Sequence, residues 1–406
     1  MDKITAGVLL SRDDSERDCS KSCFEPPGQL QANPDIGGLG VLISFMATAW
    51  LVVFLVMFRY CITFDPNSNP FHRPGKDTIR DQKKKWKPNT IDYKFTGMFK
   101  GLRGRLKNHG GWTAAINQIL LNMGDAQIIT GLGILVSSFI NLNCYISAYH
   151  WQISTYLAWF SNLTHAACLS SLRGYLYERQ MQRNFRMFFM AVLFVLLITA
   201  IVPTAYFNWE QRDSLPASSA SFPASNTHCF FSRRIAHELW NGQFCSPSEG
   251  RRSSCRKPVI TLSTTAAYES SVFSIILLGV GFIIRFVKMS RTLSDLGNNG
   301  FRERMDQWVM MSLDKLASGC QGLRVNGLGR WTLRILRPLD IMIALYLVGR
   351  LYTEILLSEL AYLSWLFLAS IWGSFRLYQA RSSAKVEGSE NEWQFGQILP
   401  YINVKP

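Results

Sequence analysis

Two long apolar stretches follow each other almost without interruption between Gly124 and Leu172, and they constrain the fold more than any other part of the chain. The first covers residues 124–142 and the second residues 148–172, and the few residues between them carry no charge. As a helix, each stretch is long enough to cross a bilayer core of about 30 Å. Because the link is so short, the two helices must be antiparallel neighbours. The pair predicts an integral membrane helical bundle.

Five further apolar blocks of about 20 residues complete the predicted fold, an all-α polytopic bundle with seven transmembrane helices. The expected spans are residues 38–60, 124–142, 148–172, 186–206, 268–287, 339–357 and 360–378. The segments outside them are a tail (1–37), a basic loop (61–122), a loop (207–267) and a second tail (379–406). With 48% apolar and 17% charged residues arranged in such blocks, the chain does not resemble two or three soluble domains.

The distribution of lysine and arginine predicts the orientation of the bundle, because cytosolic loops carry an excess of these residues. Segments 61–122, 173–186, 285–338 and 376–406 contain 12, 4, 10 and 4 of them, whereas 1–37, 143–147, 207–267 and 358–359 contain 4, 0, 7 and 0. This alternation predicts an N-terminus outside and a C-terminus in the cytosol. The net charge of +15 is therefore explained by the excess of lysine and arginine in the predicted cytosolic segments. No RNA-binding signature accompanies these residues, so a nucleic-acid partner is not expected.

Six of the nine cysteines fall on the predicted outer side: Cys19, Cys23, Cys144, Cys229, Cys245 and Cys255. An even number of cysteines facing an oxidising lumen predicts disulfides, although six cysteines leave the pairing open. At least one bridge is expected to join Cys144 or the N-terminal pair to the loop 207–267, because a tether across a long loop stabilises most.

The first cytosolic loop contains an amphipathic pattern. Phe95, Phe99, Leu102 and Leu106 recur at helical spacing, with lysines and arginines between them. A basic face beside an apolar face is suited to lying on anionic lipid. Ordinary packing against the bundle explains the same pattern equally well.

Polar side chains inside the apolar stretches are the candidates for function, because they are costly in lipid and usually face a bundle interior. Asp125 opens the second span from the cytosolic side, and His165 lies at similar depth in the third. They are weak candidates for a general acid–base pair or a proton relay. The simpler alternative is that Asp125 caps its helix and His165 is a structural core residue, so no catalytic residue is assigned.

Seven residues are candidates for contact with a ligand between the helices: Gln127, His150, Gln152, Asn162, Glu269, Arg350 and Glu354. Arg350 is expected to face inward and to meet a carboxylate, either Glu354 at i+4 or Glu269, as a structural pair or a substrate anchor. Gly131 and Gly133 are expected to allow close helix packing. The sequence contains no helix-borne metal motif, Walker A loop or Rossmann fingerprint, and neither a metal nor a cofactor is expected.

The blocks GDAQIITGLGIL (124–135) and YHWQISTYLAWFSNLTHAACLSSLRGYL (149–176) resemble a group of filamentous-fungal integral membrane proteins. Members of this group occur beside secondary-metabolite genes, including those for the perylenequinone pigment elsinochrome. The resemblance implies a fungal membrane, either the plasma membrane or an endomembrane, and a context of polyketide biosynthesis. It implies no activity and no catalytic residues.

These observations favour an accessory, small-molecule-binding or sensing protein of a fungal membrane, associated with secondary-metabolite biosynthesis. The expected partners are the lipid bilayer, a small apolar metabolite and anionic lipid at the basic loops. The second hypothesis is a membrane-embedded enzyme, such as a cyclase or isomerase, that uses Asp125 and His165. The third is a transporter, which the odd number of spans and the lack of an internal repeat disfavour.

Overall fold

The structure is a computed structural model that describes Cys23 and residues 28–67, 88–106, 111–143, 145–207, 223–242, 245–246, 254–255, 265–289, 307–311, 314, 344–355 and 358–391. Its helices are α2 (Pro34–Gly37), α3 (Leu39–Ile62), α5 (Thr90–Gly97), α6 (Lys100–Leu106), α7 (Gly111–Ile140), α8 (Ala148–Ser171), α9 (Arg173–Glu178), α10 (Gln180–Ile201), η1 (Val202–Tyr206), η3 (Thr227–Phe230), α11 (Arg233–Gly242), α12 (Ala266–Met289) and α16 (Glu359–Ser383). The strands β1 (Cys245–Ser246) and β2 (Ser254–Cys255) have two residues each and pair antiparallel, with Cys245 opposite Cys255. The expected all-helical class is confirmed.

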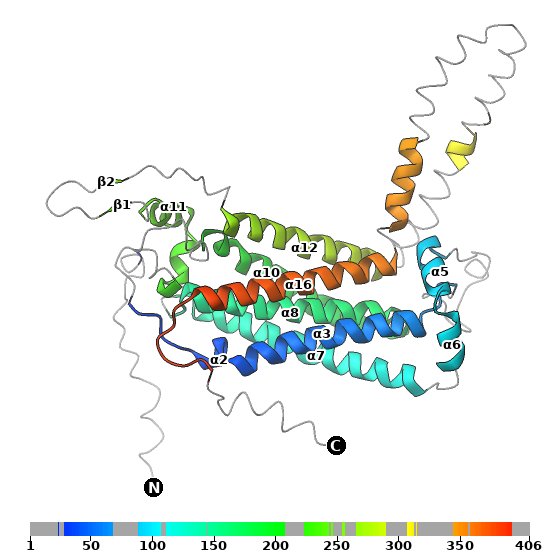
Figure 1. Cartoon of the computed structure of the whole chain (residues 1–406), viewed down its shortest axis with the longest axis horizontal. Coiled ribbons are helices and arrows are strands. Elements are labelled where there is room, and N and C mark those ends of the chain that lie inside the picture. The colour runs from blue at the N-terminus through cyan, green and yellow to red at the C-terminus, as the bar shows by residue number, and fades with distance from the viewer. Residues whose placement is uncertain are drawn as a thin grey trace, which may run out of the picture.

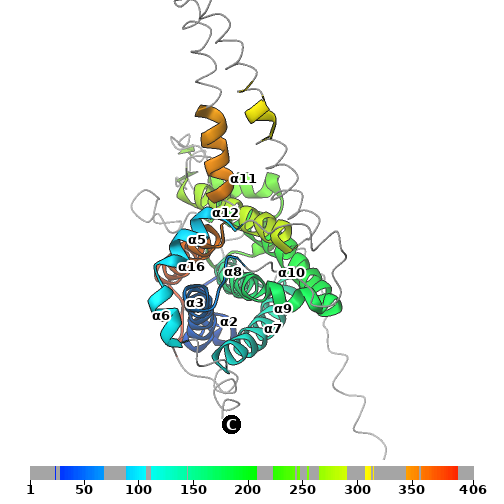
Figure 2. The ribbon, with the colours of Figure 1, turned by 90° about the vertical axis from the view of Figure 1, so that its right-hand side faces the viewer.

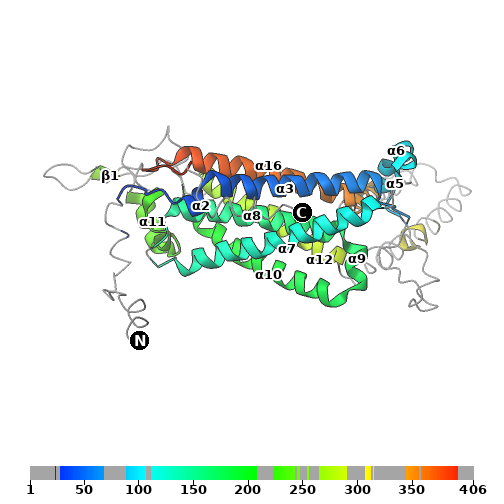
Figure 3. The same cartoon turned by 90° about the horizontal axis from the view of Figure 1, so that it is seen from below.

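Helices α3, α7, α8, α10, α12 and α16 run roughly parallel to one long axis and form the body of the molecule (Figure 1). Five segments of the described chain are long and apolar enough to cross a membrane: Pro34–Ile62, Ala114–Ile140, Gln180–Tyr206, Ala266–Met289 and Glu359–Ser383. These helices fit a membrane-embedded protein. Helices α2 and α11 lie at one end of the bundle and α5, α6 and α9 at the other, which we call the α2 end and the α5 end (Figure 3).

Helix α8 lies in the centre of the bundle and contacts α3, α7, α10, α12 and α16 (Figure 2). Every residue from Ala148 to Leu169 is buried. The hydroxyl of Ser147 caps its start by accepting a hydrogen bond from the backbone N–H of His150 at 3.2 Å. Helix α8 is not among the five segments that are long and apolar enough to cross a membrane, and the surrounding helices bury it. This position explains how a helix of this composition lies inside an apolar bundle.

Glycines allow the closest approaches to α8. A side chain at Gly131 of α7 would collide with Ser161, and one at Gly373 of α16 would lie 2.6 Å from the indole nitrogen of Trp159. Gly133 has nothing within 4 Å of the position that a Cβ would take. The expectation of close packing is therefore confirmed for Gly131 and wrong for Gly133.

The expected sixth span, 339–357, differs from the structure. Its described residues 344–355 form a helix that lies beyond the α5 end of the bundle (Figure 1). Leu345 and Tyr352 on this helix are 66% and 63% exposed. The expected count of seven spans is therefore not confirmed, and the contacts of Arg350 and Glu354 on this helix are described below.

Both described ends of the chain lie at the α2 end. Residues Gln31 and Glu387 form a parallel β-bridge, and the backbone N–H of Glu387 donates to the carbonyl of Leu30 at 2.8 Å. The guanidinium of Arg381 donates to the carbonyl of Gly37 at 2.7 Å. Helix α16 returns the chain to the end from which α3 starts, so the expected placement of the two termini on opposite sides is not confirmed.

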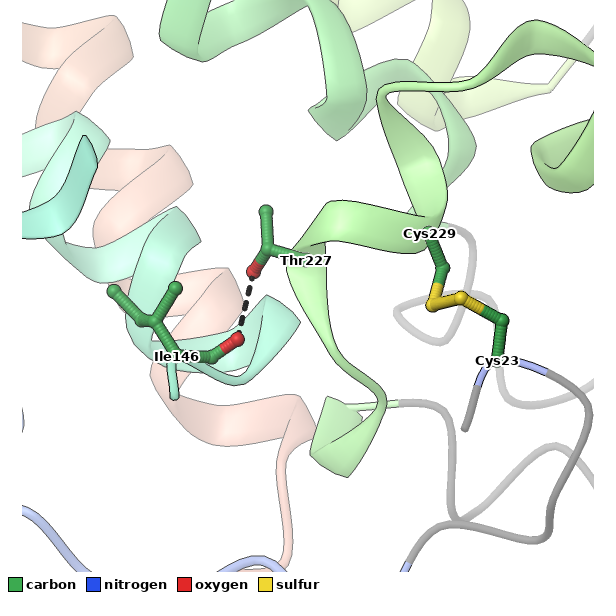
Figure 4. Close-up of a disulfide and its surroundings, with 4 residues drawn as sticks. All are labelled: Cys23, Ile146, Thr227 and Cys229. Carbon is green, nitrogen blue, oxygen red and sulfur yellow. Dashed lines mark hydrogen bonds between the residues drawn. A yellow bond between two sulfur atoms is a disulfide. The ribbon is translucent and has the colours of Figure 1, made fainter. Parts of the chain in front are cut away.

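A disulfide joins Cys23 to Cys229 at the α2 end, with 5.7 Å between the Cα atoms (Figure 4). Next to it, the backbone N–H and the hydroxyl of Thr227 donate to the carbonyl of Ile146 at 3.1 and 3.2 Å. The expected bridge between the N-terminal cysteines and the loop 207–267 is thus confirmed. Cys19 and Cys144 lie outside the described residues.

The amphipathic segment after α3 folds as two short helices, α5 and α6. Phe95 stacks on Tyr60 of α3 with 5.9 Å between ring centroids. Arg103 of α6 donates from Nε to the carbonyl of Cys61 at 2.9 Å. These contacts show ordinary packing for part of the pattern, whereas Leu102 is 47% exposed.

Candidate functional site

Asp125 and His165 do not form a pair. The guanidinium of Arg186 on α10 donates from Nε and Nη2 to the two carboxylate oxygens of Asp125, at 2.7 and 2.6 Å. The ring nitrogens of His165 face the backbone carbonyls of Gly124 and Arg186, each at 3.3 Å. Two parallel hydrogen bonds from one guanidinium fix the position and orientation of a carboxylate. The arrangement is that of an ion pair and a neighbouring core histidine.

The middle of the bundle contains buried oxygen atoms with incomplete hydrogen bonding. The hydroxyl of Ser161 on α8 donates to the backbone carbonyl of Gln127 on α7. Within the described part of the chain, Oε1 of Gln127, Oδ1 of Asn162 and Oγ of Ser154 are buried without a hydrogen-bond partner. Gln152 is also fully buried on α8. Each unpaired buried acceptor costs about 1–3 kcal/mol, so a hydrogen-bond donor brought by a ligand would be favoured here.

At the α2 end, the C-terminal segment inserts Glu390 against α8. The hydroxyl of Tyr149 donates to Oε2 of Glu390 at 2.8 Å, and Nε2 of His150 lies 3.2 Å from Oε1. Nδ1 of His150 lies 2.8 Å from Oγ of Ser147, and Glu390 is only 7% exposed. Burial raises the pKa of Glu390, but the hydrogen bonds from His150 and Tyr149 outweigh this effect and hold the pKa below its usual value. His150 is therefore occupied by the chain itself.

At the α5 end, Asp92 of α5 caps α16. Its carboxylate is 3% exposed and accepts hydrogen bonds from the hydroxyls of Tyr60 and Ser358 at 2.7 and 2.8 Å. It also accepts from the backbone N–H groups of Glu359 and Leu360 at 2.9 and 3.1 Å. The carboxylate thus satisfies free donors at the start of a long helix and interacts with its dipole. A lone aspartate in a basic loop gave no sequence signal for this role.

Basic side chains surround the same helix start. Nζ of Lys288 on α12 lies 3.3 Å from Oε1 of Glu359, and Nη1 of Arg173 lies 3.8 Å from the same oxygen. The guanidinium of Arg285 donates to the carbonyl of Ala166 on α8. In the sequence analysis, Arg173, Arg285 and Lys288 contributed only to the count of lysines and arginines in the predicted cytosolic segments. Only the fold shows that Arg285 and Lys288 point into the bundle, where they are 1% and 5% exposed.

Arg350 pairs with Glu354, which was one of the two expected partners, with 3.7 Å between Nε of the arginine and Oε1 of the glutamate. The pair does not face the bundle interior: Glu354 also accepts a hydrogen bond from the hydroxyl of Thr90, and its carbonyl accepts from Asn89 of α5 at 2.8 Å. Glu269, the alternative partner, is exposed at the start of α12 at the α2 end, whereas the helix that carries Arg350 lies beyond the α5 end.

Within the part of the chain that the structure describes, no group of three or more histidine, cysteine, aspartate or glutamate side chains is placed to hold a metal ion.

Comparison with known proteins gives one informative similarity. No protein-family profile and no solved structure matches the chain. The Elsinochromes biosynthesis cluster protein HP3 of Elsinoe fawcettii is 27% identical over 135 residues, which are 33% of this chain and 44% of HP3. The chain therefore matches less than half the length of this relative. The similarity supports the resemblance to proteins associated with a secondary-metabolite cluster.

Proposed function

We propose that this chain crosses a membrane six times, with both ends on the outer side and the α5 end in the cytosol. The five apolar segments and the shielded helix α8 support this number of crossings. Segments 61–122, 173–186 and 285–338, which leave or enter the bundle at the α5 end, contain 12, 4 and 10 lysines or arginines. The disulfide at the other end is typical of an oxidising compartment, so two independent features give the same orientation.

For its role, we propose an accessory, small-molecule-binding or sensing protein associated with secondary-metabolite biosynthesis. The observation that carries this proposal is the set of unpaired buried oxygens on α7 and α8, at Gln127, Ser154 and Asn162. An apolar molecule with hydroxyl groups would supply the missing donors in a low-dielectric interior. The similarity to a cluster protein of an elsinochrome-producing pathway supports the metabolic context. The proposed partners are the bilayer, an apolar metabolite and anionic lipid at the basic loops.

The enzyme hypothesis is second because its residues are engaged in other contacts. Asp125 is held by Arg186, and His165 faces two backbone carbonyls. A carboxylate whose two oxygens both accept hydrogen bonds from one arginine is not free to take a proton from a substrate. The transporter hypothesis stays third, although six spans would remove the objection that an odd number raised.

Metabolite and transcript profiling of a deletion strain separates the three hypotheses. For a binding or sensing protein, we expect altered expression of the neighbouring biosynthetic genes or altered product yield, without accumulation of a precursor. An accumulated precursor would favour the enzyme, and product retained inside the cell would favour the transporter. Either result would overturn the proposed role.

Complementation with Asn162→Leu tests the site itself. This change removes an unpaired acceptor, so protein abundance should be kept or raised while the phenotype is lost. Thr164→Val is the matched control, because the Thr164 hydroxyl donates within α8 to the carbonyl of Phe160 at 2.8 Å. Asn162→Leu with full activity would show that the unpaired oxygens serve no ligand.

A further inference from the structure

Two basic side chains of α12 are buried side by side at the α5 end. Arg285 and Lys288 are 1% and 5% exposed and lie one helical turn apart. Cζ of Arg285 lies 4.2 Å and Nζ of Lys288 5.5 Å from the centroid of the same ring, that of Tyr362 on α16. Two positive charges therefore share one apolar surround, in which their mutual repulsion is poorly screened.

Arg285 has no carboxylate partner in the described part of the chain. No ion pair within 4.0 Å includes it, and its Nε is buried without a hydrogen bond. Its guanidinium donates to the carbonyl of Ala166 and lies over the ring of Tyr362. Because a guanidinium stays protonated in proteins, this charge cannot be removed by deprotonation. A buried charge without a counter-charge is strongly unfavourable.

The neighbouring carboxylates already have closer partners than Arg285. Glu359 is shared by Lys288 and Arg173, at 3.3 and 3.8 Å. Asp92 already accepts four hydrogen bonds from Tyr60 and the start of α16. Arg59 of α3, nearby at the same end, donates to the hydroxyl of Ser171 at 3.0 Å and belongs to no ion pair among the described residues. Among these described residues at the α5 end of the bundle, the basic side chains therefore outnumber the carboxylates.

We propose that the α5 end binds an oxyanion, a phosphate or carboxylate group, between Arg285 and Lys288. The planar guanidinium offers its free Nε–H to an oxyanion, and the ammonium of Lys288 adds a second charge. Lys288 precedes the last residue of α12 and Glu359 is the first of α16, so the group enters from the end of the bundle. An anionic lipid headgroup and a soluble anion share this chemistry. The site does not depend on the proposed metabolic role.

The test uses the purified full-length protein in nanodiscs and measures the midpoint of thermal unfolding. In neutral phosphatidylcholine, inorganic phosphate is titrated against chloride at equal ionic strength. A saturable rise with phosphate identifies a soluble anion. A rise seen only when phosphatidylserine or phosphatidylinositol replaces part of the lipid identifies a headgroup. No rise in either arm overturns the proposal.

Variants separate a binding site from a purely structural cluster. Arg285→Gln should weaken the anion response at least about tenfold, the loss of one charge-assisted contact. Arg234→Gln, at the α2 end where the side chain is 87% exposed, should leave the response unchanged. If Arg285→Gln does not fold, Glu359→Gln still tests the anion site. It removes the carboxylate that pairs with Lys288 and Arg173, so it should strengthen the anion response. Glu359→Gln without a stronger anion response would contradict the site.

Discussion

At the scale of single residues, charges within the bundle are held by partners from other helices. Asp125 of α7 pairs with Arg186 of α10, while Asp92 of α5 caps α16. None of these partners is close in sequence. Their contacts depend on how the helices are arranged around α8, which hydropathy does not report. This is why the sequence identified Asp125 as notable but did not identify Arg186 as its partner.

Asp125→Asn should lower the free energy of unfolding by about 1–2 kcal/mol, because it leaves the guanidinium of Arg186 without its counter-charge in a half-buried position. Thermal unfolding of the purified protein measures the change, and adding Arg186→Gln should recover part of it. His165→Ala gives the comparison for a neutral core residue. If Asp125→Asn abolished function at unchanged stability, the acid–base hypothesis would gain instead.

Glu390 should make the α2 end sensitive to acid. Its pKa in the folded protein lies below the ordinary value of 4.5, so the charged form stabilises the fold. This contribution is fully present above about pH 4.5 and is lost as the pH falls through the lower folded pKa. The midpoint difference between the wild type and Glu390→Gln, measured from pH 7 to pH 4, should therefore be constant at first and then shrink. Glu387→Gln, at an exposed position three residues away, is the control for the loss of one carboxylate.

At the scale of elements, composition identified which segments form helices, but it did not identify where each of these helices lies in the structure. Helices α3, α7, α8, α10, α12 and α16 occupy six of the seven expected spans, because blocks of about 20 apolar residues have few other stable arrangements. The segment 339–357 has the same composition, yet its described part lies outside the bundle, where α5 provides partners for Glu354. Hydropathy measures whether a helix tolerates lipid, and it does not measure whether neighbours leave room for it.

The contact between α7 and α8 should be sensitive to a single methyl group. Gly131→Ala places a Cβ against Ser161, so we expect a loss of about 1–3 kcal/mol from overpacking. Gly133→Ala, two residues away with nothing within 4 Å, should be neutral or stabilise by about 0.5–1 kcal/mol through helix propensity. Thermal unfolding of both variants provides the comparison. Equal effects at the two positions would mean that α7 is rotated about its axis.

At the scale of the whole molecule, the two termini should lie on one side of the membrane. Glycosylation reporters fused at the N-terminus and the C-terminus should both be modified, whereas a reporter at Lys84 in the loop 61–122 should not. This follows from the β-bridge between Gln31 and Glu387 at the α2 end. A modified N-terminal reporter with an unmodified C-terminal one would restore the seven-span arrangement and place a crossing within 339–357.

The burial of α8 has a consequence for how the protein is made. A helix with no lipid-facing side has little affinity of its own for the bilayer, so its residence there depends on its neighbours. Of those neighbours, α3 and α7 are synthesised before it, while α10, α12 and α16 leave the ribosome later. Each new protein therefore passes through a stage in which α8 has only α3 and α7 beside it, and in which the insertion machinery or a chaperone must shield its other faces. Synthesis of α16 ends that stage, because α16 covers the face of α8 that carries Trp159.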